Sequence, residues 1–208
     1  MSTNNHARSI LQFLRLAEKL KLEMRHSWLS NGRQESVGEH TWMMALFAML
    51  TYRQLKAPID IDKALKMIII HDLAEVEVGD IPFTEQSERK RNKQALEEAA
   101  MEKIYSMLPK EEAEEICLLW REYEERSTPE AKFIKALDTL EAQIQHNLAD
   151  LKTWEEIEFE LVYTKMDQHC VHDSYLKELC DQVKLWSEEE MTAFGIDPKS
   201  IKKQISNL

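Results

Sequence analysis

Helical periodicity is the feature of this 208-residue sequence that most limits its possible folds. Apolar residues recur at spacings of three and four, as in residues 10–20 and 42–50, and no segment shows the alternation typical of a strand. Only four glycines and five prolines interrupt the chain, so we expect long helices. No internal repeat, low-complexity tract or flexible linker divides it. The sequence therefore predicts an all-α, single-domain helical bundle over residues 1–208.

The pair His71-Asp72 lies within an apolar run from Met67 to Glu75, where polar side chains without partners would cost free energy. A divalent metal ion is one possible partner, because imidazole and carboxylate are good ligands for first-row metals. On a helix, Glu75 falls between His71 and Asp72 in angle and about 6 Å further along the axis. That position suits contact with a water molecule rather than with the ion. The alternative is a buried His-Asp pair that is satisfied by its own hydrogen bond.

His40 is a candidate metal ligand upstream of this pair. Ser36 and Glu39 form the S-x-x-E pattern of a capping box, so His40 is expected in the first turn of a helix. A ligand at that place would lie on a rigid element, close to free backbone N–H groups that favour anions. The alternative is a histidine at the surface next to the cap.

Asp138 is the candidate ligand downstream. It belongs to a helix that is expected to begin at Ser127 or Thr128, with Pro129 in the first turn. Because Asp138 lies in the apolar stripe of that helix, its carboxylate needs a partner. Lys135 is one possible partner. If a metal ion takes that role instead, Lys135 becomes available to bind a substrate anion.

The order His40, His71-Asp72, Asp138 in a helical chain resembles the HD-domain metal-dependent phosphohydrolases. Within them, several segments are similar to the small 5′-deoxynucleotidases: Arg25-His26-Ser27-Trp28, Glu35 to His40, and His71 to Pro82. The resemblance runs from about Leu14 to about Ala149. It implies an HD core over about 14–149, followed by C-terminal helices over about 150–208.

The resemblance also implies roles for individual residues. One divalent ion would be held by His40, His71, Asp72 and Asp138. Glu75 would orient or deprotonate the attacking water, Asp80 would lie near the scissile ester oxygen, and Arg25 would hold the phosphate. Trp28 would pack against the sugar or base, although the family has a tryptophan nearly adjacent to the arginine and here it comes three residues later. Asp80 also has a plain structural interpretation, as part of a helix-ending turn.

Hydrolysis of a phosphate monoester needs a Lewis acid, an activated water and a leaving group in line. Four protein ligands leave about two positions open on a six-coordinate ion. Two imidazoles with two carboxylates fit one Mn, Co, Fe, Ni or Zn ion better than Mg or Ca. The predicted activity is hydrolysis of deoxyribonucleoside 5′-monophosphates. The alternatives are another nucleotide substrate (a nucleoside triphosphate, a cyclic nucleotide or a guanosine polyphosphate) and a non-catalytic binding protein stapled by its metal.

The net charge of −11 would repel a nucleic-acid polymer, so a small anionic nucleotide is the expected ligand. The basic run Arg89-Lys90-Arg91-Lys93 is interpreted as a solvated helix face, with attraction of anions as the alternative. His169 and His172 are expected at the surface. His146 lies two turns beyond Asp138, about 12 Å by rise, which is too far to share its ion.

Three cysteines without a C-x-x-C pair argue against a disulfide framework. We see no apolar signal segment in the first residues and no stretch long enough to span a bilayer. A cytoplasmic protein without membrane association is expected. The resemblance implies a homodimer, and the contact is expected at exposed tryptophans, with Trp120, Trp154 and Trp186 as candidates.

Overall fold

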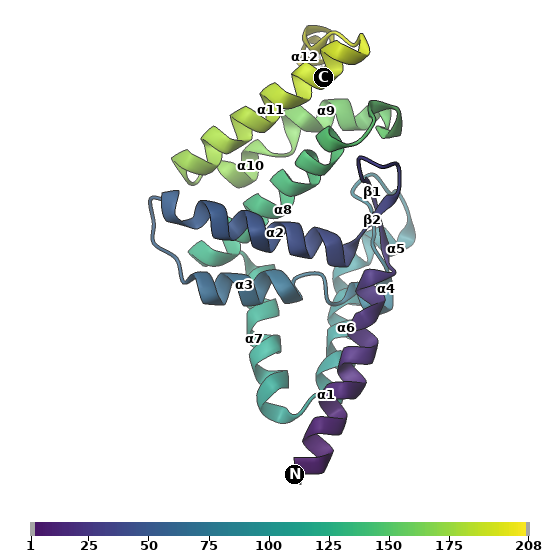
Figure 1. The fold of residues 1–208 in the computed structure, drawn as a ribbon, viewed down its shortest axis with the longest axis vertical. Coiled ribbons are helices and arrows are strands. Elements are labelled where there is room, and N and C mark those ends of the chain that lie inside the picture. Colours follow the sequence, from purple (N-terminus) through teal and green to yellow (C-terminus); the bar gives the residue numbers. More distant parts are fainter. Residues whose placement is uncertain (1–2, 207–208) are drawn as a thin grey trace.

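The computed structural model describes residues 3–206, and most of them are helical, as predicted (Figure 1). The first α-helices are α1 (Thr3–Ala17), α2 (Val37–Thr51), α3 (Ile61–Ile70), α4 (Glu75–Val78), α5 (Glu88–Arg91) and α6 (Lys93–Met107). They are followed by α7 (Lys110–Glu125), α8 (Pro129–Leu148), α9 (Glu156–Thr164), α10 (Asp167–Cys170), α11 (Ser174–Phe194) and α12 (Pro198–Ser206). Short 3₁₀ helices are η1 (Glu18–Lys21), η2 (Tyr52–Gln54) and η3 (Leu151–Thr153).

A β-hairpin between η1 and α2 is the one departure from the expected all-α pattern within residues 3–206. Strands β1 (Met24–Trp28) and β2 (Gln34–Ser36) pair antiparallel. The connecting turn is closed by hydrogen bonds between Leu29 and Arg33 and between Gly32 and Leu29, and Gly32 adopts a φ of 81°. Both strands are mostly polar, so no apolar alternation marks them in the sequence.

Helix α8 occupies the middle of the molecule and contacts α2, α3, α7, α11 and β1 (Figure 1). It begins at Pro129, and the side chain of Thr128 accepts a hydrogen bond from the backbone of Ala131, so the predicted start is confirmed. Its apolar side chains Ile134, Leu137 and Leu140 are completely buried. Because α8 is surrounded by other elements, polar residues on it are held inside the bundle.

Helix α3 ends at Ile70, earlier than the apolar run of the sequence predicts. Residues 71–74 form tight turns, in which Leu73 N–H donates to the carbonyl of Ile70 and Glu75 N–H to that of Asp72, both at 3.0 Å. These bonds span three residues instead of four, as in a 3₁₀ helix. His71 and Asp72 therefore lie at the carboxyl end of α3, and Glu75 begins the separate helix α4.

Helix caps agree with the sequence in one case and differ in another. The capping box of Ser36 and Glu39 opens α2 as predicted. Thr153 and Glu156 also have the T-x-x-E spacing of a capping box, but η3 occupies residues 151–153, and Glu155 with Glu158 form the box that opens α9. A proline marks the start of two further helices: Pro109 is the N-cap of α7, and Pro198 is the first residue of α12.

Two of the three tryptophans expected at the surface are buried. Trp120 and Trp154 are 6% and 7% exposed, and Trp186 is half-buried. The Trp154 ring packs against His146 and Phe159, and its Nε1 donates to the carbonyl of His146 at 2.9 Å. The expectation that they anchor a contact was wrong for these two, because helix packing within the chain covers their rings.

Helices α9 to α12 form a C-terminal layer beyond α8, at the opposite end of the molecule from the first turns of α1 (Figure 1). Helix α1 leaves the bundle alongside α6. Within residues 3–206, no helix combines the length and the apolar character needed to cross a bilayer.

Candidate metal centre

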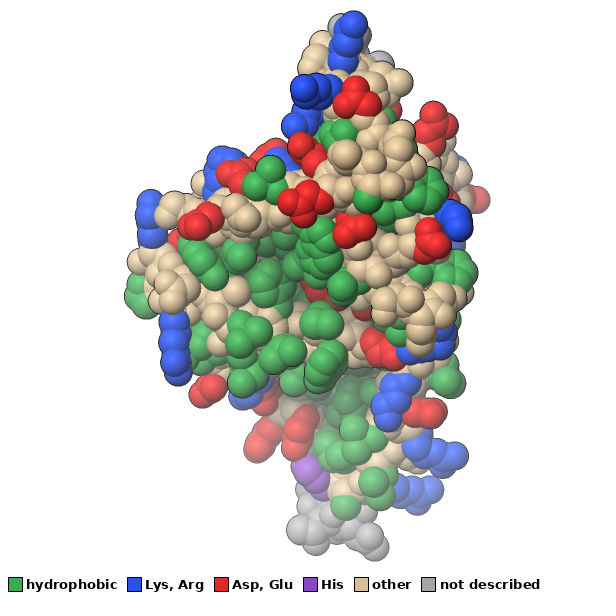
Figure 2. Space-filling view, turned by 45° about the horizontal axis from the view of Figure 1, so that its top comes forward, with side chains coloured by type: hydrophobic (Ala, Val, Ile, Leu, Met, Phe, Trp, Pro, Cys, Tyr) green, Lys and Arg blue, Asp and Glu red, His purple; other side chains and the backbone are tan. Residues whose placement is uncertain are grey.

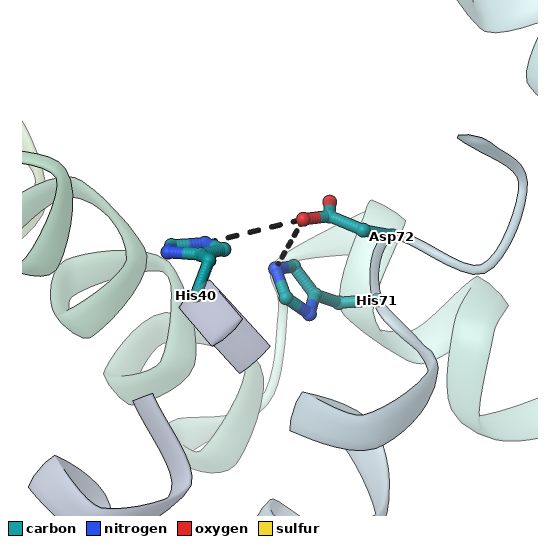
Figure 3. Close-up of side chains that lie close together, drawn as sticks. All are labelled: His40, His71 and Asp72. Carbon is teal, nitrogen blue, oxygen red and sulfur yellow. Dashed lines mark ion pairs between the residues drawn. The ribbon is translucent and has the colours of Figure 1, made fainter. Parts of the chain in front are cut away.

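Three of the residues singled out in the sequence meet where α2 approaches the end of α3 (Figure 3). One potential ligand atom from each of His40, His71 and Asp72 lies within 4.8 Å of the others. The Asp72 Oδ2 atom is 3.0 Å from His71 Nε2 and 3.9 Å from His40 Nε2. The two imidazoles are fully buried, whereas the Asp72 side chain is partly exposed.

Asp138 reaches the same place from α8. Its Oδ1 lies 3.3 Å from His40 Nε2. Its Oδ2 accepts a hydrogen bond from Lys135 Nζ at 2.6 Å and another from the hydroxyl of Tyr123 at 3.3 Å. The lysine alternative considered from the sequence is thus present, and Asp138 still directs its other oxygen toward the histidines.

The Nδ1 atoms of both histidines contact other groups of the protein. His40 Nδ1 contacts a carboxylate oxygen of Glu141, and His71 Nδ1 donates to the carbonyl of Ile68 at 2.7 Å. Such contacts fix a metal-binding imidazole in orientation and leave Nε2 with its lone pair toward the ion. His40 Nε2 and His71 Nε2 are buried and make no hydrogen bond within the described chain. Two orphaned nitrogens beside two carboxylates fit a cation.

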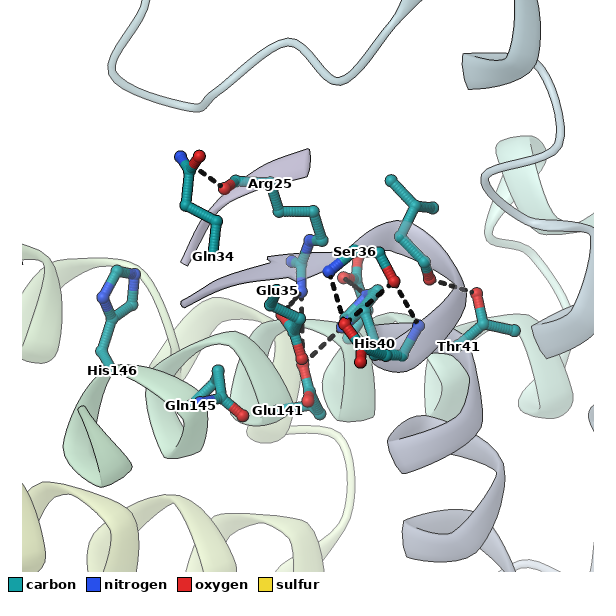
Figure 4. Close-up of polar contacts among 12 residues, drawn as sticks. Arg25, Gln34, Glu35, Ser36, His40, Thr41, Glu141, Gln145 and His146 are labelled. Carbon is teal, nitrogen blue, oxygen red and sulfur yellow. Dashed lines mark hydrogen bonds and ion pairs between the residues drawn. The ribbon is translucent and has the colours of Figure 1, made fainter. Parts of the chain in front are cut away.

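A second layer of charge lies behind His40 (Figure 4). Arg25 Nη1 donates to Glu35 at 2.7 Å and lies 3.5 Å from Glu141, and all three side chains are buried or nearly so. Burial and the nearby Glu141 raise the pKa of Glu35 to about 7, although Arg25 opposes the shift. The trio Glu35, His40 and Glu141 also has metal-like spacing, but the Arg25 guanidinium already supplies its positive charge.

The cluster attracts positive charge even without an ion. Burial and Arg25 lower the pKa of His40, but Glu141 and Asp138 outweigh them and raise it to about 9. Burial alone would raise the pKa of Asp138, yet Lys135 and His40 hold it well below its usual value. Burial opposes the same change at Asp72, where His71 lowers the pKa of the carboxyl. The carboxylates therefore stay ionised, as metal ligands must.

Glu75 and Asp80 lie beside this cluster and line the same cavity. Burial and the charges of Asp72 and Asp80 raise the pKa of Glu75 well above its usual value. Glu75 Oε2 is buried and makes no hydrogen bond within residues 3–206. Burial also raises the pKa of Asp80, with Arg25 opposing. The backbone N–H of Asp80 donates to Glu23 at 3.0 Å, and Gly79 before it has a φ of 74°, so this turn is both a helix end and part of the cavity wall.

A cavity of about 440 Å³ opens over the cluster and is lined by more basic residues than the sequence indicated. They are Arg25, Lys90, Lys93, Arg126, Lys135 and Lys165. The interpretation of the basic run as a solvated face was wrong for Lys90 and Lys93, because α5 and the start of α6 turn these two side chains inward. Arg89 does pair outside with Glu85.

His169 also lines this cavity, so the expectation of a surface position was wrong for it, whereas His172 is exposed. Lys165 and His169 come from the C-terminal layer, in a sequence stretch that is ordinary for a helix surface. Glu141 was missed too. Its signal was a carboxylate three residues after Asp138, in the same apolar stripe.

A smaller cavity of about 120 Å³ adjoins the first and shares Arg25, Asp80 and Lys165 with it. Its other walls include His26, His146 and Glu158. His146 Nε2 lies 3.4 Å from Glu158, and burial, with Arg25 next, lowers the pKa of His146 to about 3, so this ring is neutral. It belongs to this cavity and is not part of the candidate metal centre.

Trp28 does not line either cavity. It pairs with Gln34 at the end of the hairpin, and its carbonyl accepts a hydrogen bond from Gln145 at 2.6 Å. His26 stands on the cavity wall instead.

Two buried imidazoles, beside two carboxylates that line a basic cavity, define the class of a metal-dependent hydrolase acting on anions. Residues 17–177 match the HD domain family. The 5′-deoxynucleotidase HDDC2 of Homo sapiens is 40% identical over 141 residues, covering 67% of each chain. The 5′-deoxynucleotidase hdd1 of Schizosaccharomyces pombe is 37% identical over 138 residues, covering 64% of this chain and 68% of that protein.

The fold is also similar to a solved structure from Magnetospirillum magnetotacticum MS-1, named a predicted metal-dependent phosphohydrolase. The TM-score is 0.79 at 25% identity, and the match covers 95% of this chain and 99% of that one. The chain therefore belongs to the HD-domain phosphohydrolases, close to the 5′-deoxynucleotidases, and the family predicted from the sequence is confirmed.

Proposed function

We propose that this protein is a metal-dependent 5′-deoxynucleotidase that converts deoxyribonucleoside 5′-monophosphates to deoxynucleosides and phosphate. The observation that carries the proposal is the pair of orphaned Nε2 atoms of His40 and His71 beside Asp72, which lines a basic cavity. The names of the relatives support the same reaction.

The proposed ligands of a single ion are His40, His71, Asp72 and Asp138. Nitrogen and carboxylate donors in equal number favour Mn, Co, Fe, Ni or Zn over Mg and Ca. When bound, such an ion supplies a Lewis acid for the phosphoryl oxygens and makes water a better nucleophile. Glu141 and the carbonyl of Ile68 hold the two imidazoles in position.

Arg25 is proposed to bind the phosphate of the substrate. Its contacts to Glu35 and Glu141 all use Nη1, and within residues 3–206 Nε and Nη2 form no hydrogen bond. A planar guanidinium fixed at one nitrogen can present its other edge to two phosphate oxygens. Lys135, which lines the cavity beside Asp138, is proposed as a further substrate-binding cation.

Glu75 and Asp80 are proposed to handle the two protons of the reaction. The raised pKa of Glu75 makes its carboxylate a stronger base, which suits it to take a proton from the attacking water. The raised pKa of Asp80 suits an acid, which gives a proton to the departing 5′ oxygen. The new bond joins the water oxygen to phosphorus as the bond from phosphorus to the 5′ oxygen breaks.

The smaller cavity is proposed to receive the sugar and base. Its walls offer the neutral ring of His146, the His26 ring and the carboxylate of Glu158 as hydrogen-bonding groups. Trp28 was expected to take this role, but the lining of the cavity favours His26.

The proposal is tested by assaying phosphate release from a panel of deoxy- and ribonucleoside 5′-monophosphates, with chelated protein and after each metal is added back. We expect release that depends on the metal and favours deoxynucleotides. Triphosphate, cyclic nucleotide and guanosine polyphosphate arms test the other nucleotide substrates. A protein that retains stoichiometric metal but hydrolyses none of these compounds would be the metal-stapled binding protein instead.

A homodimer is proposed as the working form, with the outer face of α2 as the contact. Figure 2 shows hydrophobic side chains gathered across the middle of one face of the molecule, and α2 exposes large apolar residues there. Trp42, Met49 and Leu50 are 62%, 58% and 71% exposed, and Ile69 of α3 is 61% exposed. A helix that is apolar around its whole circumference is normally covered on all sides.

The dimer is tested by light scattering on the intact protein. We expect a dimer mass for the wild type and a monomer for Leu50→Glu. The control is Leu185→Glu, which changes another exposed leucine, on α11, and is expected to remain dimeric. A monomeric wild type, or a dimer that tolerates Leu50→Glu, would refute this contact. A cytoplasmic location is also proposed, since Cys117, Cys170 and Cys180 are free thiols.

A further inference from the structure

The six basic residues of the larger cavity fall into two groups. Arg25 pairs with Glu35, Lys93 with Glu97, and Lys135 with Asp138. Within residues 3–206, the other three have no ion pair: Lys90, Arg126 and Lys165. In a chain with a net charge of −11, three cations without carboxylate partners in one cavity indicate that this wall is built for an anion.

Lys165 has the most confined position of the three. It follows α9, lines both cavities, and places Nζ 4.2 Å from the centre of the Phe83 ring. Burial lowers the pKa of Lys165 to about 8, and the cations Lys135 and Arg25 add to the shift, although Asp138 opposes it. A half-buried lysine among like charges is costly unless a ligand supplies negative charge.

Lys90 approaches the same ring from α5. Its Nζ lies 5.5 Å from the centre of the Phe83 ring and donates to the carbonyl of Pro82 at 2.9 Å. Phe83 is 56% exposed and lines both cavities. Two lysines from distant parts of the chain are thus held around one aromatic ring, where the larger cavity meets the smaller cavity that is proposed for the nucleoside.

The hydrolysed phosphate does not account for these two lysines. The proposed metal ligands and the free edge of Arg25 already provide for one phosphoryl group. Lys165 lines the nucleoside cavity as well, so it lies where the sugar of a bound nucleotide would be. An anion at this junction would be attached to the sugar and not to the 5′ phosphate.

We propose that Lys90 and Lys165, held around Phe83, form a second anion subsite that binds a phosphoryl group on the 3′ oxygen of the nucleotide. This inference rests on the proposed function and extends its substrates to nucleoside 3′,5′-bisphosphates. The reaction is the same hydrolysis: water adds to the 5′ phosphorus, the bond to the 5′ oxygen breaks, and that oxygen takes a proton. The products are inorganic phosphate and a nucleoside 3′-monophosphate.

The test compares KM for 2′-deoxyadenosine 5′-monophosphate and 2′-deoxyadenosine 3′,5′-bisphosphate in the metal-loaded enzyme. We expect KM to be about tenfold lower for the bisphosphate. Lys165→Met and Lys90→Met should each remove most of this advantage while changing kcat for the monophosphate less than about threefold. Lys165→Arg keeps the charge and should keep most of the advantage. The control is Lys132→Met, which removes an exposed lysine of α8.

Binding supplies a readout that does not depend on turnover. In chelated protein, the bisphosphate should raise the unfolding midpoint more than the monophosphate does, and Lys165→Met should abolish the difference. Equal KM values in the wild type, or an advantage that survives both methionine variants, would overturn the subsite. If KM for 2′-deoxyadenosine 5′-diphosphate is as low as KM for the bisphosphate, the placement of the subsite at the sugar would be overturned. The proposed function fails separately, if the wild type releases no phosphate from the monophosphate.

Discussion

The two walls of the cavity are built in opposite ways. On the wall formed by α2, α3 and α8, each charged group is buried against a partner, as with His40 and Glu141 or Asp138 and Lys135. On the wall formed by α5, α9 and the loop that carries Phe83, Lys90 and Lys165 have no carboxylate partner within residues 3–206. Mutual pairing gives the first wall its precision, whereas the second wall retains unneutralised charge that a ligand can use.

This contrast separates geometry from affinity. A metal centre needs ligands fixed to within fractions of an ångström, and the proposed ligands His40 and Asp138 are held by neighbours on the long helix α8. A wall that binds an anion gains from cations that are not yet neutralised, at some expense of stability. Substitutions on the first wall should therefore lower activity or change the free energy of unfolding. Removal of a cation from the second wall should raise the free energy of unfolding.

The largest effect is expected from Asp72→Asn, which preserves shape but removes a proposed ligand charge. We expect bound metal to fall below stoichiometry and kcat/KM for phosphate release to fall about 1,000-fold or more. Metal analysis of purified protein and a phosphate assay measure the two effects. Asp62→Asn, at an exposed position of α3, the helix that precedes Asp72, serves as the control. A variant with full metal content and full activity would show that the paired wall is not the metal centre.

Glu141→Gln tests the support behind that centre. The amide can still accept a hydrogen bond from His40 Nδ1, but it no longer carries charge. We expect metal affinity to fall about 10- to 100-fold, as measured by competition with a chelator. Glu156→Gln, at an exposed position in the first turn of α9, should leave affinity unchanged. Equal affinities for Glu141→Gln and the wild type would assign Glu141 to packing alone.

Glu35→Gln tests whether repulsion between the carboxylates of Glu35 and Glu141 destabilises the paired wall. The test compares stability at two pH values. The pKa of Glu35 is raised from 4.5 to about 7 by burial and by Glu141. Its contribution to stability is therefore full below about pH 4.5 and is lost as pH rises through about 7. In chelated protein, the free energy of unfolding of the variant, relative to that of the wild type, should rise between pH 5 and pH 8 by on the order of 1–2 kcal/mol. Urea unfolding at the two pH values measures this, and a constant difference would argue against the shift.

Lys165→Met should have the smallest effect and the opposite sign. Removing a half-buried cation without a partner is expected to stabilise ligand-free protein by about 1 kcal/mol, or roughly 2–4 °C in Tm. Because the folded pKa of Lys165 is lowered to about 8, the penalty is full below that pH and fades as pH rises toward 10.5. Calorimetry at pH 7 and pH 9.5 follows the change, with Lys132→Met for comparison. Destabilisation at pH 7 would mean that Lys165 has a structural partner.

The sequence was informative where a residue contradicted its surroundings. His71 and Asp72 interrupt an apolar run, and Asp138 interrupts an apolar stripe, so the residue pattern alone calls for a chemical explanation of each. The hairpin could not be recognised in this way, because its strands are short and mostly polar and no residue in them contradicts its surroundings. The end of α3 at Ile70 was also missed, since a change from four-residue to three-residue hydrogen bonds does not alter the apolar pattern.

By itself, the sequence determined the helical class, the family, and the proposed ligands His40, His71, Asp72 and Asp138, because local periodicity and unusual residues are visible along one chain. Tertiary structure alone decided that Lys90, Lys165 and His169 face the same cavity as Asp72 and Asp138, and that Trp28 does not. Lysine and histidine are ordinary on a helix surface. Whether such a side chain meets solvent or a cavity depends on how helices far apart in sequence pack, and that information is not local.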